Sequence, residues 1–227
     1  MNRATRLLAN VARCADDDHP DLFARVLAGQ ASGTRELARS IADLIGSGDT
    51  AATLARDGRE TATHFVWPLR LGSDAPSVFV NEFKDPMATG PGYAATVHDH
   101  RYDFATLVLS GGYLHETYVL EPEPGPAVDH VQTRLTGTSQ LLVGNVAVIS
   151  HETFHRVAEL QPRTLTLVIK GAPRKPYSTS LDFESGLLRR HVPVEQRVGA
   201  LRGRRRRASR AQQARGLGAI ARREIAP

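Results

Sequence analysis

The sequence predicts a mainly β-stranded barrel or sandwich that is preceded by a helical segment. From about His64 the apolar residues leave helical spacing and gather in short runs rich in β-branched and aromatic side chains. Turn-forming residues separate those runs, and the chain holds 19 Gly and 13 Pro, which suits many short connections. Before this point the apolar residues follow helical spacing instead.

Residues 1–60 predict helices that pack against one face of the β region. Leu7 and Val11 recur at helical spacing. Pro20 suits the first turn of a second helix, and Thr34 is a good N-cap for a third. No residue in this segment indicates catalysis.

Residues 61–180 hold the runs that predict strands. Many short strands separated by turns are typical of a sandwich or a barrel. The runs cover residues 65–67, 77–83, 96–98, 104–109, 113–120, 130–135, 145–149 and 164–169.

The positive charge of the chain is concentrated at its C-terminal end. Residues 188–227 hold twelve Arg and two Glu, a net charge of +10, whereas the whole chain carries +5. Residues 181–227 therefore predict a basic, flexible tail. Such tails can bind nucleic acid or anionic membranes. This one lacks interleaved aromatic residues and any recognised nucleic-acid fold, so we expect neither partner.

Cysteine content and hydropathy predict a cytoplasmic protein without a membrane span. Cys14 is the single cysteine, so no intramolecular disulfide can form. The longest apolar stretches, such as residues 141–149, are far shorter than the roughly 20 residues that a bilayer needs. The N-terminal apolar run is broken by Asn10 and Arg13, which argues against a secretory signal.

The sharpest local signal is the sequence His98-Asp99-His100. Residues i and i+2 of a strand point to the same face, so this pair can present two imidazoles to one ion. His155 follows a later predicted strand and supplies a third ligand, with His151 as a rival for that place. The sequence therefore predicts one divalent metal ion held by His98, His100 and His155.

The spacing around the first two histidines resembles the first motif of the cupin family. That motif runs Gly, five residues, His-x-His, three or four residues, Glu, six residues, Gly. Here Gly92 precedes the histidine pair at the required distance, and Gly112 closes the motif. With a spacing of four residues, Ala105 stands where the family has Glu.

The second cupin motif is also matched in part. Gly144 and His155 stand at the spacing of the family's Gly and His, whereas the intervening Pro and Gly and the final Asn are replaced. The resemblance covers about residues 63–175. It implies an all-β cupin barrel, a double-stranded β-helix or jelly roll, with the metal inside and the N-terminal helices outside.

A three-histidine set without the Glu resembles the cysteine dioxygenase branch of the cupins. The sequence also departs from that branch. The branch has a Cys where this chain has Ala105, and a His and a Tyr on a late strand where this chain has Val168 and Lys170. No counterpart of its carboxylate-binding Arg is found near Thr63 and His64. We therefore expect the metal site to carry over, but not a thiol amino-acid substrate.

Three neutral imidazoles leave open positions on a divalent ion. Fe(II) in such a site takes O2 and an organic substrate side by side, and Zn(II) acidifies a bound water. Fe(II) is the favoured metal, with Zn, Ni or Mn as alternatives. The uncompensated +2 charge favours a small-molecule substrate that is anionic or chelating.

Asp103, Tyr102 and His115 are the candidate catalytic residues. Asp103 has two interpretations, a ligand or proton acceptor beside the metal and a turn residue between strands. Tyr102 and His115 line the site in one interpretation and are ordinary strand residues in the other.

Three functions fit these residues. The favoured one is a mononuclear non-haem Fe(II) dioxygenase of a small molecule. The second is a redox-neutral Zn, Ni or Mn cupin that acts as a lyase, isomerase or hydrolase. The third is a small-ligand-binding or regulatory cupin. An exposed edge strand would allow a homodimer.

Overall fold

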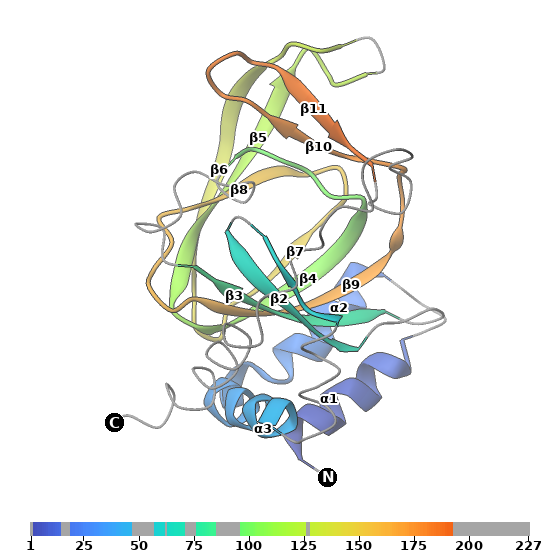
Figure 1. Ribbon diagram of the computed structural model, residues 1–227, viewed down its shortest axis with the longest axis vertical. Coiled ribbons are helices and arrows are strands. Elements are labelled where there is room, and N and C mark those ends of the chain that lie inside the picture. Colours follow the sequence, from blue (N-terminus) through green and yellow to red (C-terminus); the bar gives the residue numbers. More distant parts are fainter. Residues whose placement is uncertain are drawn as a thin grey trace.

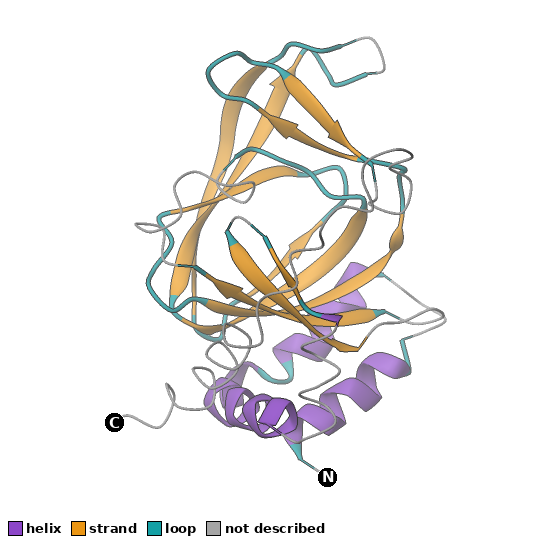
Figure 2. Cartoon of the chain, in the orientation of Figure 1, coloured by secondary structure: helices purple, strands orange, loops and turns teal. Residues whose placement is uncertain are grey.

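Three helices and eleven strands follow one another in the computed structural model, as far as its residues are described (Figure 1, Figure 2). None of the described helices is long and apolar enough to cross a membrane. The structure describes residues 2–14, 19–46, 57–61, 63–70, 76–84, 96–125 and 128–192.

The three helices form where the apolar spacing predicted them. They are α1 (Arg3–Ala12), α2 (Pro20–Ala28) and α3 (Thr34–Gly46), with a short 3-10 turn (Ala31–Gly33) before α3. Asn2 caps α1 by accepting a hydrogen bond from the backbone N–H of Thr5 at 2.9 Å. Pro20 opens α2, where a missing N–H costs nothing.

The strands form three antiparallel sheets. The six-stranded sheet has the order β1-β2-β3-β9-β4-β7, the three-stranded sheet has the order β6-β5-β8, and β10 pairs with β11. The strands are β1 (Arg59–Glu60), β2 (His64–Arg70), β3 (Ser77–Phe83), β4 (Tyr102–Ser110), β5 (Gly112–Glu121), β6 (Gln132–Leu142), β7 (Val146–Ile149), β8 (Phe154–Ala158), β9 (Leu165–Pro173), β10 (Ser178–Leu181) and β11 (Leu188–His191).

The strand order is that of a jelly roll, which confirms the predicted double-stranded β-helix barrel. One sheet contains β3-β9-β4-β7, and the other contains β6-β5-β8. His98 pairs with His155 on the free side of β8 as an isolated bridge, so its segment takes the place of the missing strand of the second sheet. Figure 1 shows the strands curving around the barrel, with the helices against one side.

The six-stranded sheet has two chemically different faces. Its outer face packs against the helices in one apolar core that includes Phe23, Leu37 and Ile41. The strand residues in that core are Trp67, Val78, Val80, Ala105, Leu107, Leu109, Leu165, Leu167 and Ile169. Because alternate residues of a strand point to opposite faces, their neighbours in sequence face the barrel interior.

The ordered β region extends past residue 180, where the sequence placed the start of a basic tail. β10 and β11 form a hairpin whose first strand also makes a bridge from Ser180 to His98. Leu181 and Leu188 pack with Val97 and Leu120 in a small core of their own. The boundary is therefore corrected, because these apolar residues hold the hairpin on the barrel. Residues 193–227, including the four consecutive Arg of the predicted tail, lie outside the described residues, as does Gly92.

The contact between the helices and the sheet predicts a large stability effect at Phe23. Phe23 is fully buried against the outer face of the sheet. We expect Phe23→Ala to lower the free energy of unfolding by about 3–5 kcal/mol, measured by urea denaturation, because it leaves a cavity in a packed core. Leu135→Ala is the control, since Leu135 is 49% exposed, and it should change stability by no more than about 0.5 kcal/mol. Equal effects of the two substitutions would contradict a shared core.

Candidate metal centre

Backbone pairing brings two of the three predicted ligands together. The N–H of His98 donates to the carbonyl of His155, and the N–H of His155 donates to the carbonyl of His98, both at 2.9 Å. Two residues that exchange both hydrogen bonds in an antiparallel pair lie directly opposite one another. His100 follows two residues later and returns to the same face.

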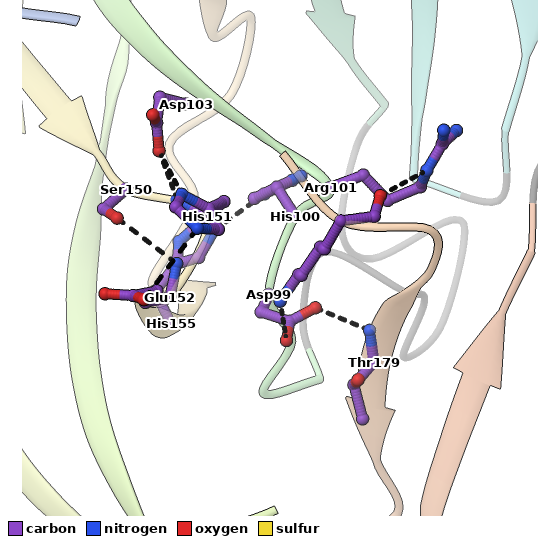
Figure 3. Close-up of polar contacts among 10 residues, drawn as sticks. Asp99, His100, Arg101, Asp103, Ser150, His151, Glu152, His155 and Thr179 are labelled. Atoms are coloured by element: carbon purple, nitrogen blue, oxygen red, sulfur yellow. Dashed lines mark hydrogen bonds and ion pairs between the residues drawn. The ribbon is translucent and has the colours of Figure 1, made fainter. Parts of the chain in front are cut away.

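The three imidazoles converge on one point. One nitrogen of each of His98, His100 and His155 lies within 4.8 Å of those of the other two. Nε2 of His100 lies 2.9 Å from Nε2 of His155, and Figure 3 shows His100 directed toward His155. Two nitrogens that each bind an ion at about 2.0–2.1 Å can lie at this separation. In the described part of the chain, this is the single group of three or more His, Cys, Asp or Glu residues with metal-binding geometry.

Burial keeps the three rings in the neutral form that binds metals. Desolvation lowers the pKa of His98 to about 4, although its hydrogen bond to Thr96 acts in the opposite direction. Desolvation, followed by the charges of neighbouring histidines, holds the pKa of His100 and of His155 well below 6.5. A neutral imidazole keeps one nitrogen lone pair for a cation.

Two of the rings are oriented by hydrogen bonds from the nitrogen that faces away from the site. Nδ1 of His98 lies 2.8 Å from the carbonyl of Thr96. A carbonyl only accepts, so Nδ1 carries the proton and Nε2 keeps its lone pair. Nδ1 of His155 lies 3.0 Å from Nε2 of His115. Such outer partners fix the tautomer and the direction of a metal-binding imidazole.

Asp99 anchors the segment between the first two histidines. Its carboxylate accepts from Nζ of Lys175 at 2.5 Å and from the N–H of Thr179 at 2.6 Å. Figure 3 shows Asp99 turned toward Thr179, away from His155. Burial raises the pKa of Asp99, while Lys175 and Thr179 act against that rise. Asp99 thus ties the histidine pair to the segment that leads into β10.

Of the predicted catalytic residues, Tyr102 and His115 lie beside the triad. The Tyr102 ring is 5.6 Å from the His100 ring, and His115 contacts His155 as described above. Burial raises the pKa of the Tyr102 phenol. Both residues therefore stay candidates for a role in the reaction.

Asp103 lies between Tyr102 and Phe104 on β4 and points to the opposite face of the strand. Its carboxylate accepts from the N–H and the Nδ1 of His151, each at 2.7 Å, and lies 3.5 Å from Arg174. Burial alone would raise the pKa of Asp103, but the contacts with His151 and Arg174 lower it. The structure thus brings Asp103 and His151 to one another and not to the triad.

Phe104 also faces the triad from β4. Its ring lies 4.7 Å from that of His100, edge to face. Ala105, which the motif spacing placed at the family's Glu position, is fully buried in the helix-side core instead. The shorter permitted spacing of three residues would have selected Phe104. In either alignment the first motif offers no carboxylate to the metal.

His64 is a further histidine in the barrel that sequence reasoning did not select. It begins β2, and its Nδ1 lies 2.9 Å from the hydroxyl of Thr63. Desolvation, Arg59 and His98 lower its pKa to about 3. The sequence indicated only that His64 begins a strand, and this does not distinguish a residue of the site from an ordinary strand residue.

Comparisons with known proteins give weak likenesses. No family model and no curated protein matches the chain. Similar solved structures include a hydroquinone 1,2-dioxygenase in complex with Cd2+ and 4-hydroxybenzonitrile, at 14% identity and a TM-score of 0.36, over 60% of this chain and 77% of that one. Oxalate decarboxylase from Lactobacillus farciminis, in a formate complex, shows 15% identity and a TM-score of 0.37, over 55% of this chain and 33% of that one.

A structure of DMSP lyases shows 16% identity and a TM-score of 0.39, over 74% of this chain and 92% of that one. The matched part of this chain spans about a third of the length of the oxalate decarboxylase. At such TM-scores the likenesses support no assignment of activity, and the site has to be judged on its own geometry.

The contact between His115 and His155 predicts a loss of metal affinity when His115 is removed. We expect His115→Ala to weaken Co(II) or Zn(II) binding about 10–100-fold, because His155 loses the partner that fixes its tautomer. A competition titration with a chelating dye measures this. His130→Ala is the control, since His130 is exposed and contacts the carbonyl of Ser185. Unchanged affinity in His115→Ala would show that the contact does not support the site.

The low pKa of His64 predicts a pH-dependent stability of the metal-free protein. Between about pH 3 and pH 6.5 the unfolded chain binds a proton at His64 that the folded chain does not. The free energy of unfolding therefore rises with pH across this window, with up to about 1.4 kcal/mol per pH unit from this residue. We expect His64→Gln to flatten the rise in urea denaturation curves. His19→Gln, at an exposed N-cap, should leave it unchanged, and equal slopes in all three proteins would refute the assignment.

Proposed function

We propose that this chain is a mononuclear metal-dependent cupin enzyme, a non-haem Fe(II) dioxygenase that acts on a small anionic or chelating molecule. The observation that carries the proposal is the convergence of three neutral imidazoles on one point, those of the buried His98 and His155 and of the half-buried His100. Surface histidines of no function are not expected to be desolvated together, because burying polar groups without a partner is unfavourable.

The ligand set supports a reactive metal rather than a purely structural one. Closed structural sites have four protein ligands, whereas reactive sites keep positions open. Among the described residues no carboxylate joins the three histidines as a ligand. Fe(II) held by three ligands would supply activation of O2 beside a bound organic substrate.

Residues of the chain itself would shape the reaction space. The rings of Tyr102 and Phe104 lie against His100 and would limit the access of water on that side. The pKa of Tyr102 is raised by burial, so its hydroxyl stays protonated at neutral pH and can donate a hydrogen bond to a substrate oxygen. His115 would hold His155 in the binding orientation.

A redox-neutral reaction is the second candidate. The chain has Val168 and Lys170 on β9 where the resembled dioxygenase branch has a His and a Tyr. A Zn, Ni or Mn ion in the same three-histidine site would then act as a Lewis acid in a lyase, isomerase or hydrolase. The cysteine dioxygenase likeness concerns the ligand set alone, and we do not propose a thiol amino-acid substrate.

Metal analysis followed by turnover under two atmospheres tests both candidates. The protein is purified without added metal and without a metal-binding tag, beside a His98→Ala, His100→Ala double variant. We expect about one iron per chain in the wild type and none in the variant. O2 uptake with a panel of small organic acids should then occur in the wild type only.

The alternatives give different results. Turnover without O2, with zinc, nickel or manganese bound, would favour the redox-neutral reaction. A bound metal with no turnover under either atmosphere would favour a ligand-binding or regulatory protein. No metal in either protein after reconstitution would overturn the histidine site and both enzyme proposals.

A further inference from the structure

Lys170 projects from β9 toward the interior of the barrel. Leu167 and Ile169 on this strand pack in the helix-side core, so Lys170 lies on the opposite face. Its cross-strand neighbour on β4 is Phe104, and its neighbour on β3 is Ser77. The ring of Phe104 lies against that of His100, so Lys170 lies next to the wall of the metal centre.

Aromatic rings connect the Lys170 ammonium group with the triad. Nζ lies 4.4 Å from the centre of the Tyr102 ring and 4.9 Å from that of Phe79. Tyr102 also lies 5.6 Å from the ring of His100. The ammonium group and the histidines therefore share the Tyr102 ring as a common boundary. Cation–π contacts with two rings favour one position of the flexible lysine side chain.

We propose that Lys170 binds the anionic group of the substrate, so that the substrate is a small organic acid with one donor atom at the metal and a carboxylate at Lys170. This inference rests on the proposed metal centre and adds the substrate class. Aromatic surroundings strengthen the attraction between an ammonium group and a carboxylate, because the effective dielectric constant is lower than in water. They also suit a planar substrate, which can lie against Tyr102 and Phe79.

The chain has three lysines, so the role of Lys170 can be compared with that of the other two. Lys175 is bound to Asp99 at 2.5 Å. The third lysine of the chain, Lys84, is bound to Glu60 at 2.7 Å. Lys84 therefore offers a matched control that removes a lysine elsewhere on the barrel.

The test compares two probes of nearly equal shape, nicotinate and nicotinamide, on the Co(II)-loaded protein. Each can bind the metal through its ring nitrogen, and only nicotinate carries a carboxylate. The visible absorption band of Co(II) reports first that the metal is bound and then that a probe has joined it. We expect the wild type to bind nicotinate at least about 10-fold more tightly than nicotinamide.

Three variants complete the design. Lys170→Met should lower the ratio of the two affinities several-fold while nicotinamide affinity stays as in the wild type, and the preference that remains comes from the charge of the metal ion and the more basic ring nitrogen of nicotinate. Lys170→Arg should keep most of the preference, because it keeps the charge, and Lys84→Met should keep all of it. Lys170→Arg also decides the matter if Lys170→Met fails to fold, since a lost preference in a folded Arg variant would count against a charge interaction.

The outcomes separate this inference from the proposed function. Equal affinities for the two probes in Co(II)-loaded wild type, or failure of nicotinate to bind, would overturn the Lys170 subsite and leave the metal centre intact. An undiminished preference in Lys170→Met would overturn it as well. Absence of the Co(II) band in the wild type would overturn the metal centre and this inference together.

Discussion

The reciprocal pair of backbone hydrogen bonds between His98 and His155 is the constraint on which the site depends. These residues are 57 positions apart in the sequence, and the two 2.9 Å bonds place them directly opposite each other. His100 then follows on the same face because of the two-residue repeat of extended chain. Asp99 lies between His98 and His100 in the sequence and points away from the site. Its carboxylate binds Lys175 and Thr179 and so holds the segment in place. The same alternation therefore separates the ligand side of this segment from its anchoring side.

The six-stranded sheet repeats this separation on a larger scale. Its outer face joins the helices in a continuous apolar core, which stabilises the strands without using any residue of the site. Its inner face is then free to carry groups that would be costly in such a core, among them Thr106, Thr166 and Lys170. Polar groups inside a barrel are unfavourable unless they find partners, so these groups need partners on the inner face.

The sequence predicted the helices and the barrel strands because both depend on local periodicity. It predicted His98 and His100 from their two-residue spacing, and His155 from its resemblance to the second cupin motif. Phe104 could not be separated from Ala105, since the motif allows two spacings and only the three-dimensional register of β4 decides between them. The β10–β11 hairpin was missed because its strands are short and lie in a stretch that reads as basic tail. The separation of Asp103 from the triad depends on its partner His151, 48 residues away, which no local pattern reveals.

The carboxylates near the triad are paired with basic side chains of the protein, so the site lacks a negative charge of its own. Asp99 is paired with Lys175, Asp103 with His151 and Glu116 with Arg156. None of the three is left to offset a divalent ion held by neutral imidazoles. A bound ion would therefore keep its full +2 charge in partly desolvated surroundings, where attraction for an anion is stronger than in water. Because none of the described carboxylates joins the triad as a ligand, a divalent ion held there would attract an anionic substrate, and the charge of Lys170 would add to that attraction.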